Sequence, residues 1–231
     1  MSGGKWIVAA LGAGLVGLAG PASAANAGFA GFWQPVSKVE TLRTATGAAP
    51  PLKAAARKTY EANQAAAARG DRKFDDEHNC LPIGLTRLMA ESPFELVQTD
   101  KQVDFVFEWN RYVLQAPVRQ QHPKQYAYPY YVGHAIARYE GDALIVDSVY
   151  FNDETILDRS GLPHSDALHV RQQLQLEGQD TLVDTLTIED PRTFTQSWQT
   201  VLKYQRLPAD TVLKEDVCVE RLGLKKLDAS K

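Results

Sequence analysis

The stretch that decides the fold is YYVGHAIARYEGDALIVDSVYFN, residues 130–152. Its two arms are separated by Glu140-Gly141-Asp142, which supplies the glycine and aspartate that a tight turn between antiparallel strands needs. In the first arm Gly133, Ala135 and Ala137 alternate with His134, Ile136 and Arg138, and Asp147 shares a face with isoleucine and valine in the second. A hairpin this apolar predicts a closed or covered sheet. In such a sheet the side chains of His134 and Asp147 need hydrogen-bond partners or a functional role.

The bulk composition narrows the class of protein. The chain has 231 residues, of which 44% are hydrophobic and 23% charged. This length is sufficient for one well-packed domain. The net charge is −3 and no run of lysine or arginine stands out. We therefore expect neither nucleic-acid binding nor electrostatic docking to a membrane.

The N-terminus resembles a secretory signal. Lys5 precedes a short apolar run over 6–20, and Ala22-Ser23-Ala24 matches the small-x-small cleavage pattern. The alternative is a transmembrane anchor, but glycines interrupt the run and it is short for a bilayer. We expect cleavage of residues 1–24, export, and no membrane association afterwards. Export favours a disulfide between Cys80 and Cys218, and the alternative is two buried free thiols.

The order of patterns along the chain predicts a mainly β fold. We expect an N-terminal arm over 25–90 with one helix at about 53–69, a barrel over 91–220 and a flexible tail over 221–231. About eight period-two segments joined mostly by short turns predict a single antiparallel up-and-down barrel. In the strand predicted from His164 onward, even positions face inward and His169 faces water. Gly31-x-Trp33 resembles the first strand of lipocalin-type barrels, where the tryptophan plugs the closed end, although a surface-anchoring tryptophan fits equally.

Several segments resemble a widespread family of exported bacterial proteins whose function is uncharacterised. The resemblance lies in segments beginning at Cys80, Glu95, Gly133, Pro163 and Thr187, with GHAIARYEGDALIVD over 133–147 the most specific. The family usually carries Ser, Gly, Trp and Thr where this chain has Ala135, Ala137, Tyr139 and Ala143. The resemblance implies a periplasmic or secreted protein of shared architecture, and it implies no activity.

The candidate catalytic residues are two histidines and two aspartates. His134 is interpreted either as a buried imidazole with a hydrogen-bond partner or as a general acid/base. His164 and Asp166 lie two apart at the start of a predicted strand, where the aspartate either orients the imidazole or caps a loop. Asp147 is either a hydrogen-bond anchor or an acid of raised pKa. His122, in a loop, is most simply solvated.

A second set of residues is predicted to bind substrate. Glu108 and Arg111 form either a rim ion pair or a guanidinium site for a developing oxyanion. The tyrosines of the loop line a pocket mouth or form a surface for protein contact. With the tryptophan of the preceding strand, the predicted binding side chains are Arg111, Glu108, Tyr126, Tyr128, Tyr131 and Trp109. His134 and His164 with an aspartate could form a metal site, but no H-x-H or HExxH spacing supports one, so we expect no metal and no cofactor.

Two functions of different classes fit these residues. The first is an exported, cofactor-free enzyme that performs proton-transfer chemistry, as a lyase, hydratase or isomerase, on a small apolar or aromatic molecule in a barrel pocket. The second is a non-catalytic carrier of a hydrophobic ligand, which needs the cavity but not the histidines. A weaker third is an envelope scaffold that docks another protein through its Tyr/Pro loop. The sequence makes no prediction of the oligomeric state.

Overall fold

A computed structural model describes residues 28–75, 77, 80–124 and 128–223. The expected signal segment 1–24 and the end of the expected tail, 224–231, lie outside the described residues. The prediction of a mainly β barrel with one N-terminal helix is confirmed. The strands number nine rather than about eight, because the Gly31-x-Trp33 segment forms a strand of its own.

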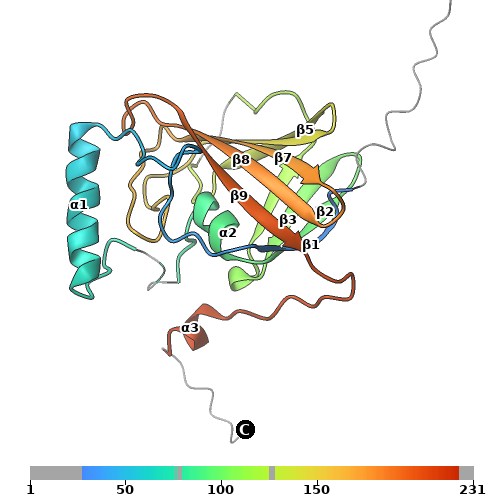
Figure 1. Ribbon diagram of the computed structural model, residues 1–231, viewed down its shortest axis with the longest axis horizontal. Coiled ribbons are helices and arrows are strands. Elements are labelled where there is room, and N and C mark those ends of the chain that lie inside the picture. Colours follow the sequence, from blue (N-terminus) through green and yellow to red (C-terminus); the bar gives the residue numbers. More distant parts are fainter. Residues whose placement is uncertain (1–27, 76, 78–79, 125–127, 224–231) are drawn as a thin grey trace, which may run out of the picture.

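The barrel is one sheet in which most strands pair with their neighbours in the chain, and β9 returns to pair with β1 (Figure 1). Its order is β4-β3-β2-β1-β9-β8-β7-β6-β5, and all eight of these pairs are antiparallel. The strands are β1 (Gly31–Pro35), β2 (Phe94–Gln98), β3 (Gln102–Phe107), β4 (Val113–Pro117), β5 (His134–Glu140), β6 (Ala143–Val149), β7 (His169–Glu177), β8 (Thr181–Glu189) and β9 (Trp198–Arg206).

The two ends of the sheet meet through a short parallel contact. Val118, just after β4, forms an isolated parallel bridge with Ala137 of β5. The backbone N–H of Arg119 donates to the carbonyl oxygen of Ala137 at 3.1 Å. β5 then begins at His134, after a connection of which residues 119–124 and 128–133 are described. The barrel is therefore nearly closed, and its seam lies between β4 and β5.

The hairpin that suggested this fold is present in the predicted register. β5 and β6 are joined at Gly141, whose φ of +62° is the left-handed conformation that a tight turn requires. Ala135 and Ala137 are buried inside the barrel core. His134 and Asp147, on the opposite face, therefore point to the outside of the wall.

Trp33 is buried in the hydrophobic core of the barrel. Its side chain is fully buried, and its indole N–H donates to the carbonyl oxygen of Phe29 at 2.9 Å. The guanidinium of Arg206 lies 4.1 Å from the ring centroid, a cation–π contact. Trp33 is therefore no surface anchor, and its role as a plug stays a prediction.

Helices cover the rest of the barrel unequally (Figure 1). α2 (Leu85–Glu91) is buried along nearly all of its length and contacts β1. α1 (Ala54–Ala68) has no buried residue and stands at the side of the molecule. A 3-10 turn, η2 (Trp109–Arg111), and the short α3 (Cys218–Arg221) complete the elements. No helix in the described part of the chain is long and apolar enough to span a membrane.

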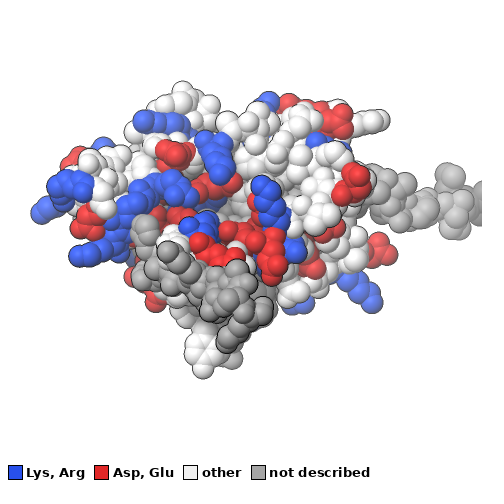
Figure 2. Space-filling model, turned by 90° about the horizontal axis from the view of Figure 1, so that it is seen from below, with Lys and Arg blue, Asp and Glu red and all other residues white. Residues whose placement is uncertain are grey.

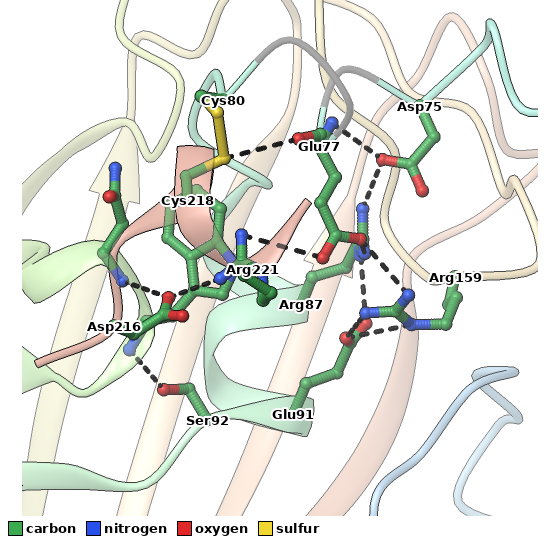
Figure 3. A network of polar contacts seen from close by, with 12 residues as sticks. Asp75, Glu77, Cys80, Arg87, Glu91, Ser92, Arg159, Asp216, Cys218 and Arg221 are labelled. Atoms are coloured by element: carbon green, nitrogen blue, oxygen red, sulfur yellow. Dashed lines mark hydrogen bonds and ion pairs between the residues drawn. A yellow bond between two sulfur atoms is a disulfide. The ribbon is translucent and has the colours of Figure 1, made fainter. Parts of the chain in front are cut away.

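A disulfide and a set of ion pairs fasten the C-terminal segment to α2 (Figure 3). The predicted Cys80–Cys218 disulfide is confirmed. Arg87, almost wholly buried, pairs with Asp75 at 2.7 Å, Glu91 at 2.9 Å and Glu77 at 3.0 Å. Burial alone would lower the pKa of this guanidinium, but Glu91 and Asp75 outweigh it and raise the pKa. We call this arrangement the clasp.

The surface around the clasp carries charges of both signs. Figure 2 shows acidic and basic side chains intermixed on the face seen from the side of α3. No extended area of one sign dominates that view. This distribution gives no electrostatic support for a polyanionic partner on this face.

Candidate functional site

Four side chains form a continuous hydrogen-bonded chain on the outer wall of the barrel. Nδ1 of His134 lies 2.9 Å from Nδ1 of His122, and Nε2 of His122 lies 3.0 Å from Oδ2 of Asp147. Oδ1 of the same carboxylate lies 2.7 Å from Nε2 of His169. We call these residues the outer cluster. Asp147 thus joins two imidazoles through its two oxygens.

Three adjacent strands and one loop assemble the outer cluster. His134 begins β5, Asp147 lies near the end of β6 and His169 begins β7. Strand pairing places His134 opposite Val149 and Asp147 opposite Arg171, so the outward side chains of neighbouring rows meet. His122 comes from the loop that follows the seam.

The loop is fixed where it crosses the wall. The hydroxyl of Tyr150 donates to the carbonyl oxygen of Pro123 at 3.0 Å. The Tyr150 ring also lies edge-on to His122, with ring centroids 6.2 Å apart. These contacts hold the His122 imidazole above Asp147. Preorganisation of this kind is what an acid/base group needs.

The outer cluster lies beside apolar side chains. Ile136 and Ile145 share the outward face with His134 and Asp147 but are only 1% and 0% exposed. The side chains of His122 and Asp147 lie next to these isoleucines and are 13% and 16% exposed. Electrostatic interactions are stronger beside such surfaces than in open water, because the local dielectric is lower.

Hydrogen-bond partners assign the ring protons. A carboxylate only accepts, so the nitrogens facing Asp147 are N–H groups: Nε2 of His122 and Nε2 of His169. Neutral His122 then accepts at Nδ1, which makes Nδ1 of His134 the donor. In neutral His134, Nε2 is the basic nitrogen. A proton taken there is coupled through His122 to the negative charge of Asp147.

The environment moves the pKa values of the two terminal imidazoles in opposite directions. The hydrogen bond to Asp147 raises the pKa of His169 above its ordinary value of 6.5, against the effect of burial. Burial lowers the pKa of His134, and the positive charges of His122, when it is protonated, and of Arg119 lower it further. Burial would raise the pKa of Asp147, but His169 and His122 outweigh it, so the carboxyl stays ionised. The cluster therefore offers a base and an acid at one pH.

His164 and Asp166 are placed elsewhere. The strand that was expected to begin at His164 begins at His169. The residues before it form a loop, in which the Ser165 backbone N–H donates to the Asp190 carboxylate at 2.6 Å. His164 is buried, with Nε2 2.7 Å from the Thr155 hydroxyl and Nδ1 3.0 Å from the Ser165 carbonyl oxygen. Burial lowers its pKa, so it is a neutral, hydrogen-bonded imidazole.

Asp166 does not orient the imidazole of His164. Its carboxylate is exposed and forms an ion pair with Arg192. The His-x-Asp spacing was informative only if both residues belonged to one strand, and they do not. This pair is a feature of the loop surface.

The expected binding residues around η2 contact the chain's own C-terminal segment. Glu108 accepts from the Lys214 backbone N–H at 3.1 Å, and the Arg221 guanidinium lies 5.2 Å from the Trp109 ring centroid. Arg111 is exposed, with a φ of +51°. The anticipated Glu108–Arg111 ion pair is not among those of the described residues.

The loop tyrosines differ from one another in exposure. Tyr128 is 76% exposed, whereas Tyr131 is half-buried. Tyr126 lies outside the described residues. Tyr150, which was not singled out from the sequence, is the tyrosine whose contact with the outer cluster the structure defines.

Metal binding finds no support in the described geometry. No group of three or more His, Cys, Asp or Glu side chains within the described ranges is arranged to hold an ion.

Neither a family model, a curated protein nor a solved structure matches this chain. The resemblance to exported bacterial proteins thus stays a prediction. The candidate site rests on its geometry alone.

Sequence reasoning missed two members of the outer cluster. His169 was assigned to the solvent face, which is correct for the wall, but Asp147 reaches it from the neighbouring strand. The usable signal was that both residues fall on the outward face of adjacent strands. His122 offered no such signal, because a loop has no period from which to place a side chain.

Proposed function

We propose that this chain is an exported enzyme that transfers protons to and from a small, largely apolar or aromatic molecule, using the outer cluster rather than a barrel pocket. The observation that carries the proposal is the hydrogen-bonded chain His134–His122–Asp147–His169, in which one carboxylate serves two imidazoles. Pairs of titrating groups whose pKa values are driven apart are typical of acid/base sites.

The proposed roles follow from protonation. His134, whose pKa is lowered, is neutral near pH 7 and acts as the base through Nε2. His169, whose pKa is raised, is the acid, and its Nδ1 lies 3.9 Å from Oε2 of Glu189. Asp147 stabilises the positive charge that each imidazole carries in turn. A C–H deprotonation, a dehydration and an isomerisation can each use such a pair.

The substrate class and compartment follow from the surroundings. The Tyr150 ring, 36% exposed, provides an aromatic surface beside the polar groups, and Ile136 and Ile145 are buried beneath them. These favour a small molecule with an apolar or aromatic body. The Cys80–Cys218 disulfide supports an oxidising, exported location. The N-terminal segment expected to direct export lies outside the described residues.

The first test is a titration of the imidazoles by long-range proton–nitrogen NMR on the mature, disulfide-bonded chain. We expect the midpoint of His134 below about 6.5 and that of His169 above it. Removing the bridging carboxylate with Asp147→Asn should lower the midpoint of His169. Identical midpoints for His134 and His169 would refute the acid/base pairing.

The second test measures chemistry directly. The protein is incubated in deuterated water with a panel of small aromatic hydroxy acids, unsaturated acids and ketones, and mass spectrometry follows deuterium uptake and gain or loss of water. His134→Gln and His122→Gln should abolish turnover and keep the wild-type unfolding curve. His164→Gln is the matched control, because His164 lies outside the outer cluster. Turnover that survives His134→Gln but fails in His164→Gln would contradict the proposal.

A further inference from the structure

Inside the barrel, four successive strands each contribute one polar side chain. Ser148 of β6, Gln172 of β7, Asp184 of β8 and Tyr204 of β9 are all 0% exposed. They lie at positions that alternate with outward residues, so their side chains point inward. We call them the inner polar group. It belongs to a different face of the wall from the outer cluster.

Most of the hydrogen-bonding capacity of the inner polar group is unused. The Gln172 amide N–H donates to Oδ2 of Asp184 at 2.7 Å. Among the described residues, Oδ1 of Asp184, Oε1 of Gln172, the Ser148 hydroxyl and the Tyr204 hydroxyl have no partner. Buried polar atoms are almost always satisfied, since leaving one unpaired is costly. Four such atoms in adjacent strands indicate a site rather than an isolated defect.

The chemistry of these atoms calls for a donor. A carboxylate oxygen and an amide oxygen only accept, and the two hydroxyls can accept as well. The ion pairs of the described residues include none to Asp184. Burial raises the pKa of Asp184 to about 7, only partly opposed by the Gln172 hydrogen bond. The carboxyl is therefore poised to ionise when a cation arrives.

The adjoining wall is lined by small and aromatic side chains. On the strands that flank the seam, Ala116, Ala135 and Ala137 are buried in the core. Ala135 is the register partner of Ser148 in the β5–β6 ladder, so methyl groups adjoin the inward polar atoms of β6. On the other flank the Phe94 and Tyr204 rings lie edge to face, with centroids 5.1 Å apart. Aromatic faces and a carboxylate together are favourable surroundings for an ammonium group.

We propose that the barrel interior binds a small monoamine, whose ammonium group donates to Oδ1 of Asp184 and Oε1 of Gln172 while its apolar part lies against the alanine wall. An ammonium offers three donors and one positive charge, which matches the surplus of acceptors and the unpaired carboxyl. The inference is independent of the outer cluster and of the proposed proton transfer.

The test uses n-propylamine on the full disulfide-bonded chain, with n-propanol as the neutral probe of similar shape. Thermal unfolding and saturation-transfer NMR are recorded after long equilibration, because the inner polar group is fully buried. We expect the amine to raise the melting temperature and to bind more tightly at about pH 8 than at about pH 5, where Asp184 holds its proton. The alcohol should bind at least about tenfold more weakly.

Two variants decide the outcome. Asp184→Asn keeps the shape and a hydrogen bond to Gln172, and should weaken the amine about tenfold or more. Asp142→Asn, in the exposed β5–β6 turn, is the matched control and should bind as the wild type does. Equal amine binding by wild type and Asp184→Asn would overturn the proposal, as would equal responses to amine and alcohol. No response of the wild type to the amine would also overturn it and leave Asp184 as a structural acid.

Discussion

Replacing Asp184 by asparagine should stabilise the protein in a pH-dependent way. Burial in the barrel raises the pKa of this carboxyl from 3.8 to about 7. A raised carboxyl pKa means that the folded state holds the proton more tightly than the unfolded state. The wild type therefore loses stability as the pH rises from about 4 to about 7, and the loss is complete above about 7. Asparagine has no proton to lose and avoids this cost.

The size of the effect follows from the shift. At about 1.36 kcal/mol for each pKa unit, a rise from 3.8 to about 7 corresponds to about 4 kcal/mol. Urea unfolding of Asp184→Asn and wild type is compared at several pH values, with Asp142→Asn as the exposed control. We expect the difference in unfolding free energy to grow by up to about 4 kcal/mol between about pH 4 and about pH 7.5. A difference that does not change with pH would refute the reasoning, because Asp184 would then not titrate in this range.

Three further substitutions test the packing and the clasp. Arg87→Met leaves Asp75 and Glu91 without their buried cation. It should lower the unfolding free energy by about 3–5 kcal/mol in urea titrations, and a loss below about 1 kcal/mol would argue against the clasp. Cys80→Ser opens a disulfide that joins residues 138 positions apart and should cost about 4–5 kcal/mol in the same assay, whereas an unchanged urea midpoint would contradict this. Trp33→Ala should cost about 3–5 kcal/mol in thermal or urea unfolding, and a smaller loss would mean that the barrel core collapses around the gap.

The barrel was predictable because its signals are local. Alternation along β5 and β6 fixes which face is buried, and Gly141 fixes the turn, so the register follows from the sequence. The same reasoning applies to β7 and β8, which Gly178 separates. A chain of hairpins leaves few topologies other than an up-and-down sheet.

The outer cluster was only partly predictable, because it depends on contacts between distant elements. His134 and Asp147 were recognised as polar residues in apolar strands, and both belong to the cluster. His164 looked equivalent to them, but its strand begins later, and a shift of boundary changes where a side chain points. His122 could not be placed, since its position depends on how the loop crosses the closed wall.

The inner polar group left a readable signal in the sequence. Asp184 lies between Leu182 and Leu186 on the inward face of its strand, and Gln172 lies between Val170 and Leu174. A polar residue at an inward position among leucines is the departure from pattern that marks a functional or strained site. What the pattern does not reveal is that these side chains meet across neighbouring strands.

The parallel contact between Val118 and Ala137 at the seam follows from the odd number of strands in the barrel. A ring of strands in which every neighbouring pair is antiparallel must contain an even number of strands, and this ring has nine. One contact is therefore obliged to be parallel, and the chain must travel back along the barrel before β5 can begin. That return path carries His122 over the outer wall to Asp147. A barrel with one strand more or fewer would close with a simple hairpin at this place and would have no segment to deliver that imidazole.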